Sequence, residues 1–524
     1  MSLTPLTSNL GVSRAKHLLR RACFHYNKNL LYTISELNAE QAIEYLLQDN
    51  TVSYTEPYDP LPTENPHGFW LSSSEYPPNI PNQARKRGLL SQWWFYNMVN
   101  RNNLKDKLLF FLHTTFTISS GDVGASHYFY DHLRLLEYFS DGNLRVLAKK
   151  ITLDNAMLNY LDNTQNNANN PNENYAREFL ELFTITKGEQ IGEGDYSTYT
   201  EDDVIQAARV FSGFKTMLDR SIIDPDTGIP MGRININQHD QGDKIFSHAF
   251  DNYELQAGTD QNSIMDELHE FVDMIFNKEA TAKAYVEKLY RFFVKSEWSS
   301  MDEINIINPL TQQMIDNDYE IMPIVRTLLS SQHFYDAGDG DPSDEILGSI
   351  IKSPLQLLAS AIRNLGFVIP NPEDDMDNYY RFLFLLPLLL VPFNNNHFVI
   401  SSILLFAFFP FNASVFYQLP STYMVLTYIF LFSYIYYFIF KNNFTKIENN
   451  IFYGFLWLII LFCYESAIGV AFAMPFLLWL KNTASGNKFD FKEYFNLTLT
   501  ISISTIIFLI IYFTDSSNIK LTSL

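Results

Sequence analysis

Cysteine is nearly absent from this chain of 524 residues, which contains only Cys23 and Cys463. The two lie far apart in the sequence, so neither a disulfide framework nor a cysteine-based metal site is expected. The N-terminus lacks a basic stretch followed by an apolar run, and no secretory signal peptide is therefore predicted.

Basic residues are also scarce, because 37 Lys and Arg stand against 58 Asp and Glu and give a net charge of -21. Nearly all of the excess lies before residue 381, where there are 53 acidic and 30 basic residues. Such an acidic surface repels phosphate backbones, and no basic stripe with interleaved aromatic residues offsets it. Nucleic acid is therefore not an expected partner.

Charge of either sign becomes rare after residue 380, and long apolar segments replace it. Residues 381–524 contain 7 basic and 5 acidic residues. A membrane-spanning helix needs about 20 apolar residues, so the composition predicts a multi-pass membrane region of about four to six segments in contact with the lipid bilayer. The segments are Phe382–Phe393, Phe398–Phe411, Thr422–Phe440, Ile451–Leu480 and Leu497–Phe513.

Residues 1–380 are predicted to form an acidic soluble domain of mainly α fold, since apolar residues recur at spacings of three and four. Thr200 followed by Asp203 matches a capping box and places a helix start near residue 201. The alternation of Arg233–Asn237 predicts a short strand. Helices are predicted over Leu104–Phe116, His127–Phe139, Asp203–Phe214, Met265–Phe276 and Thr281–Val294.

An asparagine-rich stretch, Asn163–Asn174, leads into a helix predicted to end near Thr186. Asn170 is the predicted N-cap, with Pro171 at the first helical position and Glu173 at the third. At about 100° per residue, apolar side chains form one stripe and polar side chains the opposite face. The stripe contains Tyr175, Ala176, Phe179, Leu180, Leu182 and Phe183, and the polar face contains Asn174, Arg177, Glu178 and Glu181.

Several segments resemble a bacterial family known as domain of unknown function 1800, and together they cover residues from about 10 to 370. The segments are Asn172–Thr184, Tyr199–Val204, Ala207–Gly213, His17–Phe24, His113–Thr117, Ala156–Asn163, His239–Lys244, Lys288–Phe293 and Lys352–Pro354. The resemblance implies a protein associated with the bacterial envelope, but it implies no reaction. It also implies a ligand-binding site formed by Asn163, Glu173, Asn174, Arg177, Glu178 and Glu181.

A metal-dependent enzyme is an alternative hypothesis, in which a divalent cation would be the cofactor. Its metal-ligand candidates are His113, His239 and Asp240, and its catalytic candidates are Glu178, Glu181, His239, Asp240 and Glu465. The chain contains no His-Glu-x-x-His motif, which favours capping or surface roles for the histidines. Glu465 is the one acidic residue within its apolar segment, and a carboxylate at membrane depth is a functional candidate.

The sequence thus favours a membrane- or envelope-associated protein that binds a small molecule or an envelope protein through the polar face at 173–181. The apolar C-terminal region is loosely similar to multispan membrane glycosyltransferases, so a fragment of such an enzyme or of a transporter is a further alternative. The family's usual closing segment is not found after Pro370. A truncated or chimeric gene would also explain the change in composition near residue 380.

Overall fold

The computed structural model describes residues 2–48, 56–57, 59, 69–71, 82–337 and 346–364. Contacts divide the chain into two units, Met1–Tyr379 and Tyr380–Leu524, and every described residue belongs to the first. The predicted membrane segments, including Glu465, lie outside the described residues. Within the described part of the chain, no helix combines the length and apolarity needed to cross a membrane.

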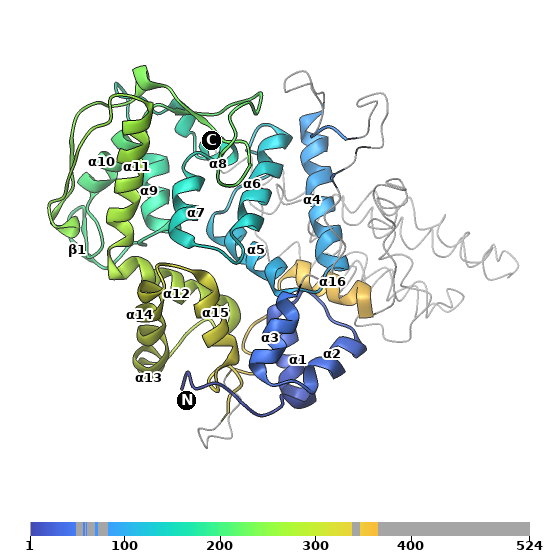
Figure 1. Cartoon of the computed structure of the whole chain (residues 1–524). Helices are drawn as coiled ribbons and strands as arrows, with labels where there is room; N and C mark the ends of the chain where they lie inside the picture. Colours follow the sequence, from blue (N-terminus) through green and yellow to red (C-terminus); the bar gives the residue numbers. More distant parts are fainter. Residues whose placement is uncertain are drawn as a thin grey trace, which may run out of the picture. The chain divides into compact units, whose positions relative to one another are not determined.

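The described domain is mainly helical, as predicted, with three two-stranded antiparallel ribbons (Figure 1). Its α-helices are α1 (Gly11–Ala22), α2 (Lys28–Ser35), α3 (Ala39–Leu47), α4 (Gln83–Asn100), α5 (Leu104–Thr115), α6 (Ser126–Tyr138), α7 (Leu144–Ile151), α8 (Asn155–Tyr160), α9 (Glu173–Glu178), α10 (Glu201–Val210), α11 (Gln261–Phe276), α12 (Glu279–Phe293), α13 (Ser300–Asp302), α14 (Asn308–Asp316), α15 (Ile321–Ser330) and α16 (Pro354–Asn364). The ribbons pair β1 (Gln190–Gly192) with β2 (Asp195–Tyr196), β3 (Phe214–Lys215) with β4 (Arg233–Ile234), and β5 (Lys244–Ile245) with β6 (Glu254–Leu255).

All five helices predicted from apolar periodicity are present, as α5, α6, α10, α11 and α12. The predicted capping box is confirmed at α10, where the Asp203 carboxylate accepts the Thr200 N–H at 2.7 Å. The predicted strand at Arg233 is shorter than expected. Only its first two residues pair with β3, because the chain turns into a 3-10 helix, η3 (Ile236–Gln238), directly afterwards.

The helix after the asparagine-rich stretch begins two residues later than predicted. Asn172, rather than Asn170, is the N-cap of α9, and its side chain accepts the Asn174 N–H at 3.0 Å. The cause is the buried Asn166, whose side-chain oxygen accepts the Asn172 N–H at 3.0 Å. This contact fixes the backbone just before α9, so the predicted cap at Asn170 is wrong.

A π-helical turn, η2 (Phe179–Phe183), follows α9 directly. The Thr184 hydroxyl donates to the Phe179 carbonyl, five residues earlier, at 2.7 Å. A π turn contains more residues than an α turn, so a stripe projected at about 100° per residue loses its register there. Leu182, predicted to be buried, is 52% exposed, whereas Phe183 is buried as predicted.

Aromatic rings form the core beneath the polar face of α9. The Phe211 ring lies at the centre, with its centroid 4.9 Å from that of Tyr175 and 5.1 Å from that of Phe179. The Phe271 ring of α11 completes the cluster at 5.4 Å from Phe211, and all four side chains are fully buried. Burial of one such side chain contributes about 1.5–3 kcal/mol, so the cluster fixes α9, η2, α10 and α11 relative to one another.

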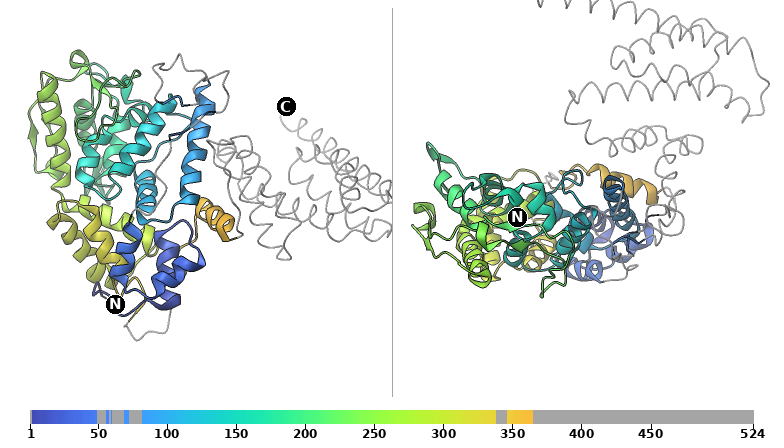
Figure 2. Two further views of the ribbon diagram at one scale, coloured as in Figure 1. Left: turned by 45° about the vertical axis from the view of Figure 1, so that its right-hand side comes forward. Right: turned by 90° about the horizontal axis from the view of Figure 1, so that it is seen from above.

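The two ends of the described domain meet, because α16 packs against α4 and reaches the end of α1 (Figure 2). The Gln356 side-chain amide donates to the carbonyls of Arg20 at 2.6 Å and Cys23 at 3.1 Å. The Ser360 hydroxyl donates to the Phe24 carbonyl at 2.9 Å. Carbonyls at the end of a helix lack intrahelical partners. At the end of α1, side chains of α16 donate the hydrogen bonds that these carbonyls need.

Candidate functional site

Asn163 and Asn174, two of the predicted ligand-binding residues, hold the backbone around α9. Asn163 is fully buried; its amide donates to the Phe211 carbonyl at 3.1 Å and its oxygen accepts from the Asn166 amide at 3.1 Å. Asn174 is exposed, and its amide donates to the Leu161 carbonyl at 3.3 Å. Asn163 and Asn174 therefore bond to backbone carbonyls outside the asparagine-rich stretch and hold that stretch against its neighbours.

Arg177 joins α9 to α10 through a forked ion pair. Its two terminal nitrogens lie 2.9 and 2.7 Å from the two carboxylate oxygens of Glu201, and Glu173 lies 3.4 Å away. The hydrogen bonds with Glu201 raise the pKa of Arg177, and the same bonds lower the pKa of Glu201. Bidentate pairs of this kind fix geometry, although side chains that are about one-third exposed gain little stability from the charge.

Glu181 of η2 lies in a second polar group beside this pair. Its carboxylate accepts a hydrogen bond from the Tyr199 hydroxyl and lies 3.5 Å from the Lys187 ammonium. Burial, and then the bond to Glu181, raises the pKa of Tyr199. The Lys187 ammonium also lies 4.2 Å from the centroid of the Tyr196 ring. Glu181 is therefore held by groups from the β1–β2 region that follows it.

Glu178 differs from its neighbours, because the described residues provide it with neither a hydrogen bond nor an ion pair. Its side chain is half-buried. Burial raises the pKa of Glu178, and the nearby charge of Glu181 raises it further, while Arg177 opposes both effects. Of the predicted polar face, Glu178 is thus the carboxylate that remains available to a ligand.

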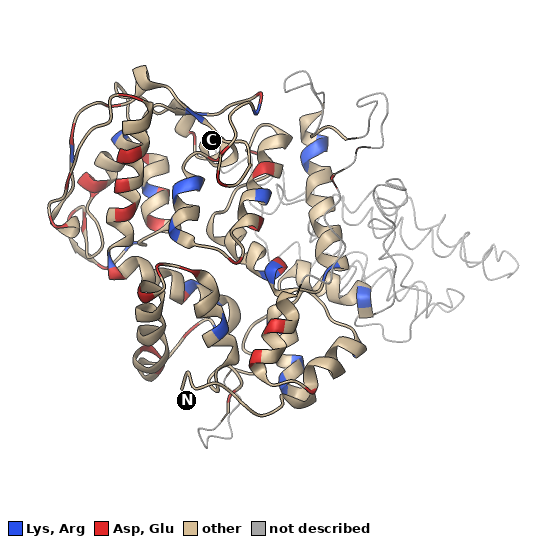
Figure 3. Cartoon of the chain, viewed as in Figure 1, with Lys and Arg blue, Asp and Glu red and all other residues tan. Residues whose placement is uncertain are grey.

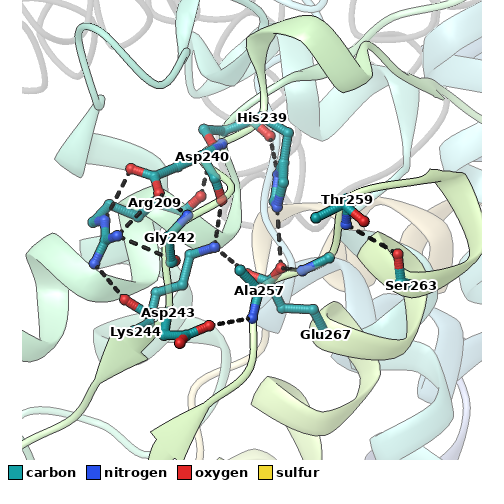
Figure 4. Close-up of polar contacts among 12 residues, drawn as sticks. Arg209, His239, Asp240, Gly242, Asp243, Lys244, Ala257, Thr259, Ser263 and Glu267 are labelled. Atoms are coloured by element: carbon teal, nitrogen blue, oxygen red, sulfur yellow. Dashed lines mark hydrogen bonds and ion pairs between the residues drawn. The ribbon is translucent and has the colours of Figure 1, made fainter.

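His239 and Asp240 lie in a different network, formed with α10, α11 and the loop around β5 (Figure 4). Arg209 forms a forked pair with Asp240, with both N–O distances 2.9 Å. Burial opposes ionisation of Asp240, but the bonds from Arg209 and from the Gly242 N–H outweigh it and lower the pKa. The Asp240 N–H donates to the Ser212 hydroxyl at 2.8 Å, which ties the loop to the end of α10.

The inner part of this network is a fully buried group of His239, Lys244 and Glu267. The Glu267 carboxylate lies 2.6 Å from the Lys244 ammonium and accepts the Gly258 N–H at 2.7 Å. His239 lies 2.9 Å from the Ser212 carbonyl through Nδ1 and 3.1 Å from Glu267 through Nε2. Both ring nitrogens of His239 therefore face oxygen atoms.

The inner group contains the residue types of an acid–base site, but a substrate has no access to it. All three side chains have no exposed surface, so no substrate atom can reach them in this structure. In the described domain, His239 and Asp240 make no polar contact with Glu178 or Glu181. The predicted catalytic residues therefore fall into two separate groups.

His113 lies apart from both of these groups, between α4 and α6. Its ring centroid is 4.8 Å from Trp94 and 5.8 Å from His132, and burial, followed by His132, lowers its pKa to about 3. His132 Nδ1 lies 2.8 Å from the Asp154 carboxylate. His127, His132 and His239 are buried, so the expectation of a surface position is wrong for these three histidines.

The metal-ligand candidates His113, His239 and Asp240 are not brought together as a set of three. The first belongs to α5, and the other two belong to the network of Figure 4. Among the residues that the structure describes, no group of three or more His, Cys, Asp or Glu side chains is arranged to hold a metal ion.

Glu267, Lys244 and Glu201 take part in these polar clusters, although none of them was predicted to be a site residue. The position of Glu267 in the sequence indicates a buried carboxylate, since it lies one helical turn after the buried Ile264 and just before the buried Leu268. A carboxylate on the apolar stripe of a predicted helix requires a buried partner. The partners themselves are distant in the sequence, and only the tertiary fold identifies them.

These observations define a mainly helical domain in which separate polar clusters are held by internal ion pairs. The chain belongs to the family described as "Protein of unknown function (DUF1800)", which matches residues 17–389. The family resemblance seen in the sequence is thereby confirmed. The match begins at His17 rather than near residue 10, and it extends beyond Pro370 and across the change in composition near residue 380.

No curated protein and no solved structure matches the chain. The likeness of residues 381–524 to membrane glycosyltransferases is not shown by the comparisons.

Proposed function

We propose that this protein binds a partner at the bacterial envelope, and that Arg177, Glu178 and Glu181 form the surface that receives a cationic group. The observation that carries the proposal is Glu178, a half-buried carboxylate without a partner among the described residues. Burial and the charge of Glu181 both disfavour its ionised form. A positive group placed against Glu178 would offset both effects, which favours binding of a cation at this point.

The surroundings of Glu178 support a rigid binding surface. Arg177 is engaged by Glu201 and Glu173, so its guanidinium is not free to neutralise Glu178 fully. The aromatic core below holds α9 and η2 in place, and a surface that is already ordered loses little entropy on binding. Asp and Glu also occur along the neighbouring helices α10 and α11 (Figure 3), which adds a negative field around the surface.

The nearby Leu182 favours a protein partner over a free cation. It lies four residues after Glu178 in the following π turn and is 52% exposed. A segment that presents Lys or Arg beside an apolar side chain would contact both residues. The apolar composition of residues 381–524 supports a position at a membrane, where envelope proteins are available as partners.

A peptide-binding assay on the full-length chain tests this proposal. Fluorescence anisotropy with peptides containing Lys or Arg beside Leu or Phe should detect binding at low salt. Glu178→Gln should weaken the affinity about tenfold, because a charge-assisted hydrogen bond contributes about 1.5–3 kcal/mol. The control is Glu40→Gln, an exposed carboxylate on α3. Equal affinities of wild type and Glu178→Gln would refute the proposal.

A further inference from the structure

A cleft of about 480 Å³ lies between α1 and the segment that leads into α16. It is unusual for so acidic a chain, because its lining carries four cationic side chains and, among the described residues, no carboxylate. The four cations are Lys16, Arg20, Arg21 and Lys352. Segments more than 300 residues apart in the sequence, at the two ends of the described domain, therefore form one basic cleft.

Two buried side chains on the α1 wall of the cleft have polar atoms without partners. Arg21 is 7% exposed; one terminal nitrogen donates to the Ile346 carbonyl at 3.0 Å, and the other, Nη1, has no hydrogen-bond partner. His17 is 6% exposed, and its Nε2 also has no partner. The two residues are four apart on α1 and so lie on the same face of the helix. Buried polar atoms are nearly always paired, so these two nitrogens leave the α1 wall with polar groups that the described residues do not satisfy, although neither atom has an accessible surface of its own.

Among the described residues, no carboxylate lines the cleft to neutralise its positive charges. Burial, and then the charge of Arg20, lowers the pKa of Arg21 to about 10. Burial and Arg20 lower the pKa of Lys352 in the same way. Like charges held together in this manner favour an anion between them.

The cleft is also firmly built. The Lys352 ammonium donates to the Ser360 hydroxyl at 3.0 Å, and the same hydroxyl donates to the Phe24 carbonyl. Ser349 accepts from Arg21 at 3.3 Å and donates to the Val294 carbonyl at 3.0 Å. Lys16 and Arg20 are exposed at the rim, where they can contact an entering ligand without a change in the fold.

We infer that this cleft binds a phosphate group, carried either by a soluble phosphorylated compound or by a phospholipid headgroup. A single carboxylate would neutralise only one of four cations, whereas a phosphate brings up to two charges and several acceptor oxygens. The planar guanidinium group of Arg20, which is exposed, suits such oxygens, and the buried Arg21 beside it adds positive charge.

Isothermal titration calorimetry on the purified full-length chain tests the inference with two probes, glycerol phosphate and short-chain phosphatidic acid in solution. Binding of at least one probe is expected. The double variant Lys16→Gln/Arg20→Gln should weaken it at least about tenfold, since charge-assisted hydrogen bonds are lost. Both side chains are exposed, so the variant should fold, and an unchanged unfolding temperature will verify this.

Two matched variants separate the cleft from general charge effects. Lys28→Gln removes one positive charge from α2, outside the cleft, and should change the affinity less than about twofold. Glu178→Gln should have no effect, which keeps this test independent of the proposed partner-binding surface. Binding of both probes would indicate recognition of the phosphate itself, and binding of phosphatidic acid alone would indicate a lipid headgroup.

The inference would be overturned if neither probe bound to the wild-type chain. It would equally be overturned if the double variant of Lys16 and Arg20 bound as tightly as wild type, or if Lys28→Gln lost as much affinity as the double variant.

Discussion

His239 Nε2 lies 3.1 Å from Glu267 Oε2, and neither side chain has any exposed surface. The Lys244 ammonium reaches the other oxygen of the same carboxylate at 2.6 Å. One buried carboxylate thus lies between two basic side chains, and it connects the loop around β5 to α11. This arrangement predicts a structural role that can be measured.

Replacing Glu267 with Gln should lower the free energy of unfolding by about 3–5 kcal/mol, because removal of one partner leaves buried charge uncompensated. Urea denaturation of the purified variant measures this loss. Glu270→Gln is the matched control, since Glu270 is exposed on the same helix and should cost less than about 1 kcal/mol. Similar losses in the two variants would show that the buried group has no special importance.

Gly213 should not tolerate a side chain. Its φ is +81°, and a Cβ would lie 2.7 Å from the Asn235 carbonyl oxygen and 2.8 Å from the His239 nitrogen. Gly213→Ala should therefore destabilise the fold by at least about 1–3 kcal/mol. Gly88→Ala in α4 should instead stabilise it by about 0.5–1 kcal/mol, because a Cβ there meets open space within a helix. Thermal unfolding of both variants decides the matter, and a gain of stability in Gly213→Ala would contradict the assignment.

Stability should decrease in mild acid because burial lowers the pKa of several histidines from 6.5 to about 3 or 4. These histidines are His17, His25, His113, His127 and His333. Between about pH 4 and 6.5 the unfolded chain binds more protons than the folded chain, so stability is full above pH 6.5 and is lost as the pH falls. Each histidine contributes a slope of up to about 1.4 kcal/mol per pH unit. Chemical denaturation at a series of pH values should show a shallower slope for His113→Gln than for wild type, and identical slopes would argue against burial of a neutral ring.

Divalent cations distinguish the partner-binding proposal from a metal-dependent enzyme. If Glu178 and Glu181 serve a protein partner, then Mg²⁺, Mn²⁺ or Zn²⁺ should raise the unfolding temperature of wild type and of Glu178→Gln/Glu181→Gln equally. Differential scanning fluorimetry together with elemental analysis of the purified full-length chain makes this comparison. A shift that is present in wild type and lost in the double variant would favour the enzyme hypothesis.

Much of the fold could be predicted from the sequence because most helices follow local patterns of apolar spacing and capping. Apolar periodicity located α5, α6, α10, α11 and α12, and the side chains of Thr200 and Asp203 marked the start of α10. The prediction was less accurate where a distant or irregular contact decides the backbone. Asn166 displaces the start of α9, and the π turn η2 exposes Leu182.

The residues of the polar face of α9 were predicted, but most of the contacts that they make were not. Pairing of Glu173 with Arg177 follows from their spacing of four, whereas the stronger pair of Arg177 with Glu201 joins residues 24 apart. The basic cleft illustrates the same limit. His17–Phe24 and Lys352–Pro354 were both noted in the sequence, but local spacing gives no indication that they meet.

The contacts between α16 and α1 have a consequence for the synthesis of the protein. The carbonyls of Cys23 and Phe24 receive their hydrogen bonds from Gln356 and Ser360, which the ribosome makes more than 330 residues later. The carbonyls that follow the first helix therefore gain these donors only after nearly the whole domain has been translated. A chain that ends before α16 would lack the donors, and the apolar surface that α16 covers would be open to a chaperone or a protease.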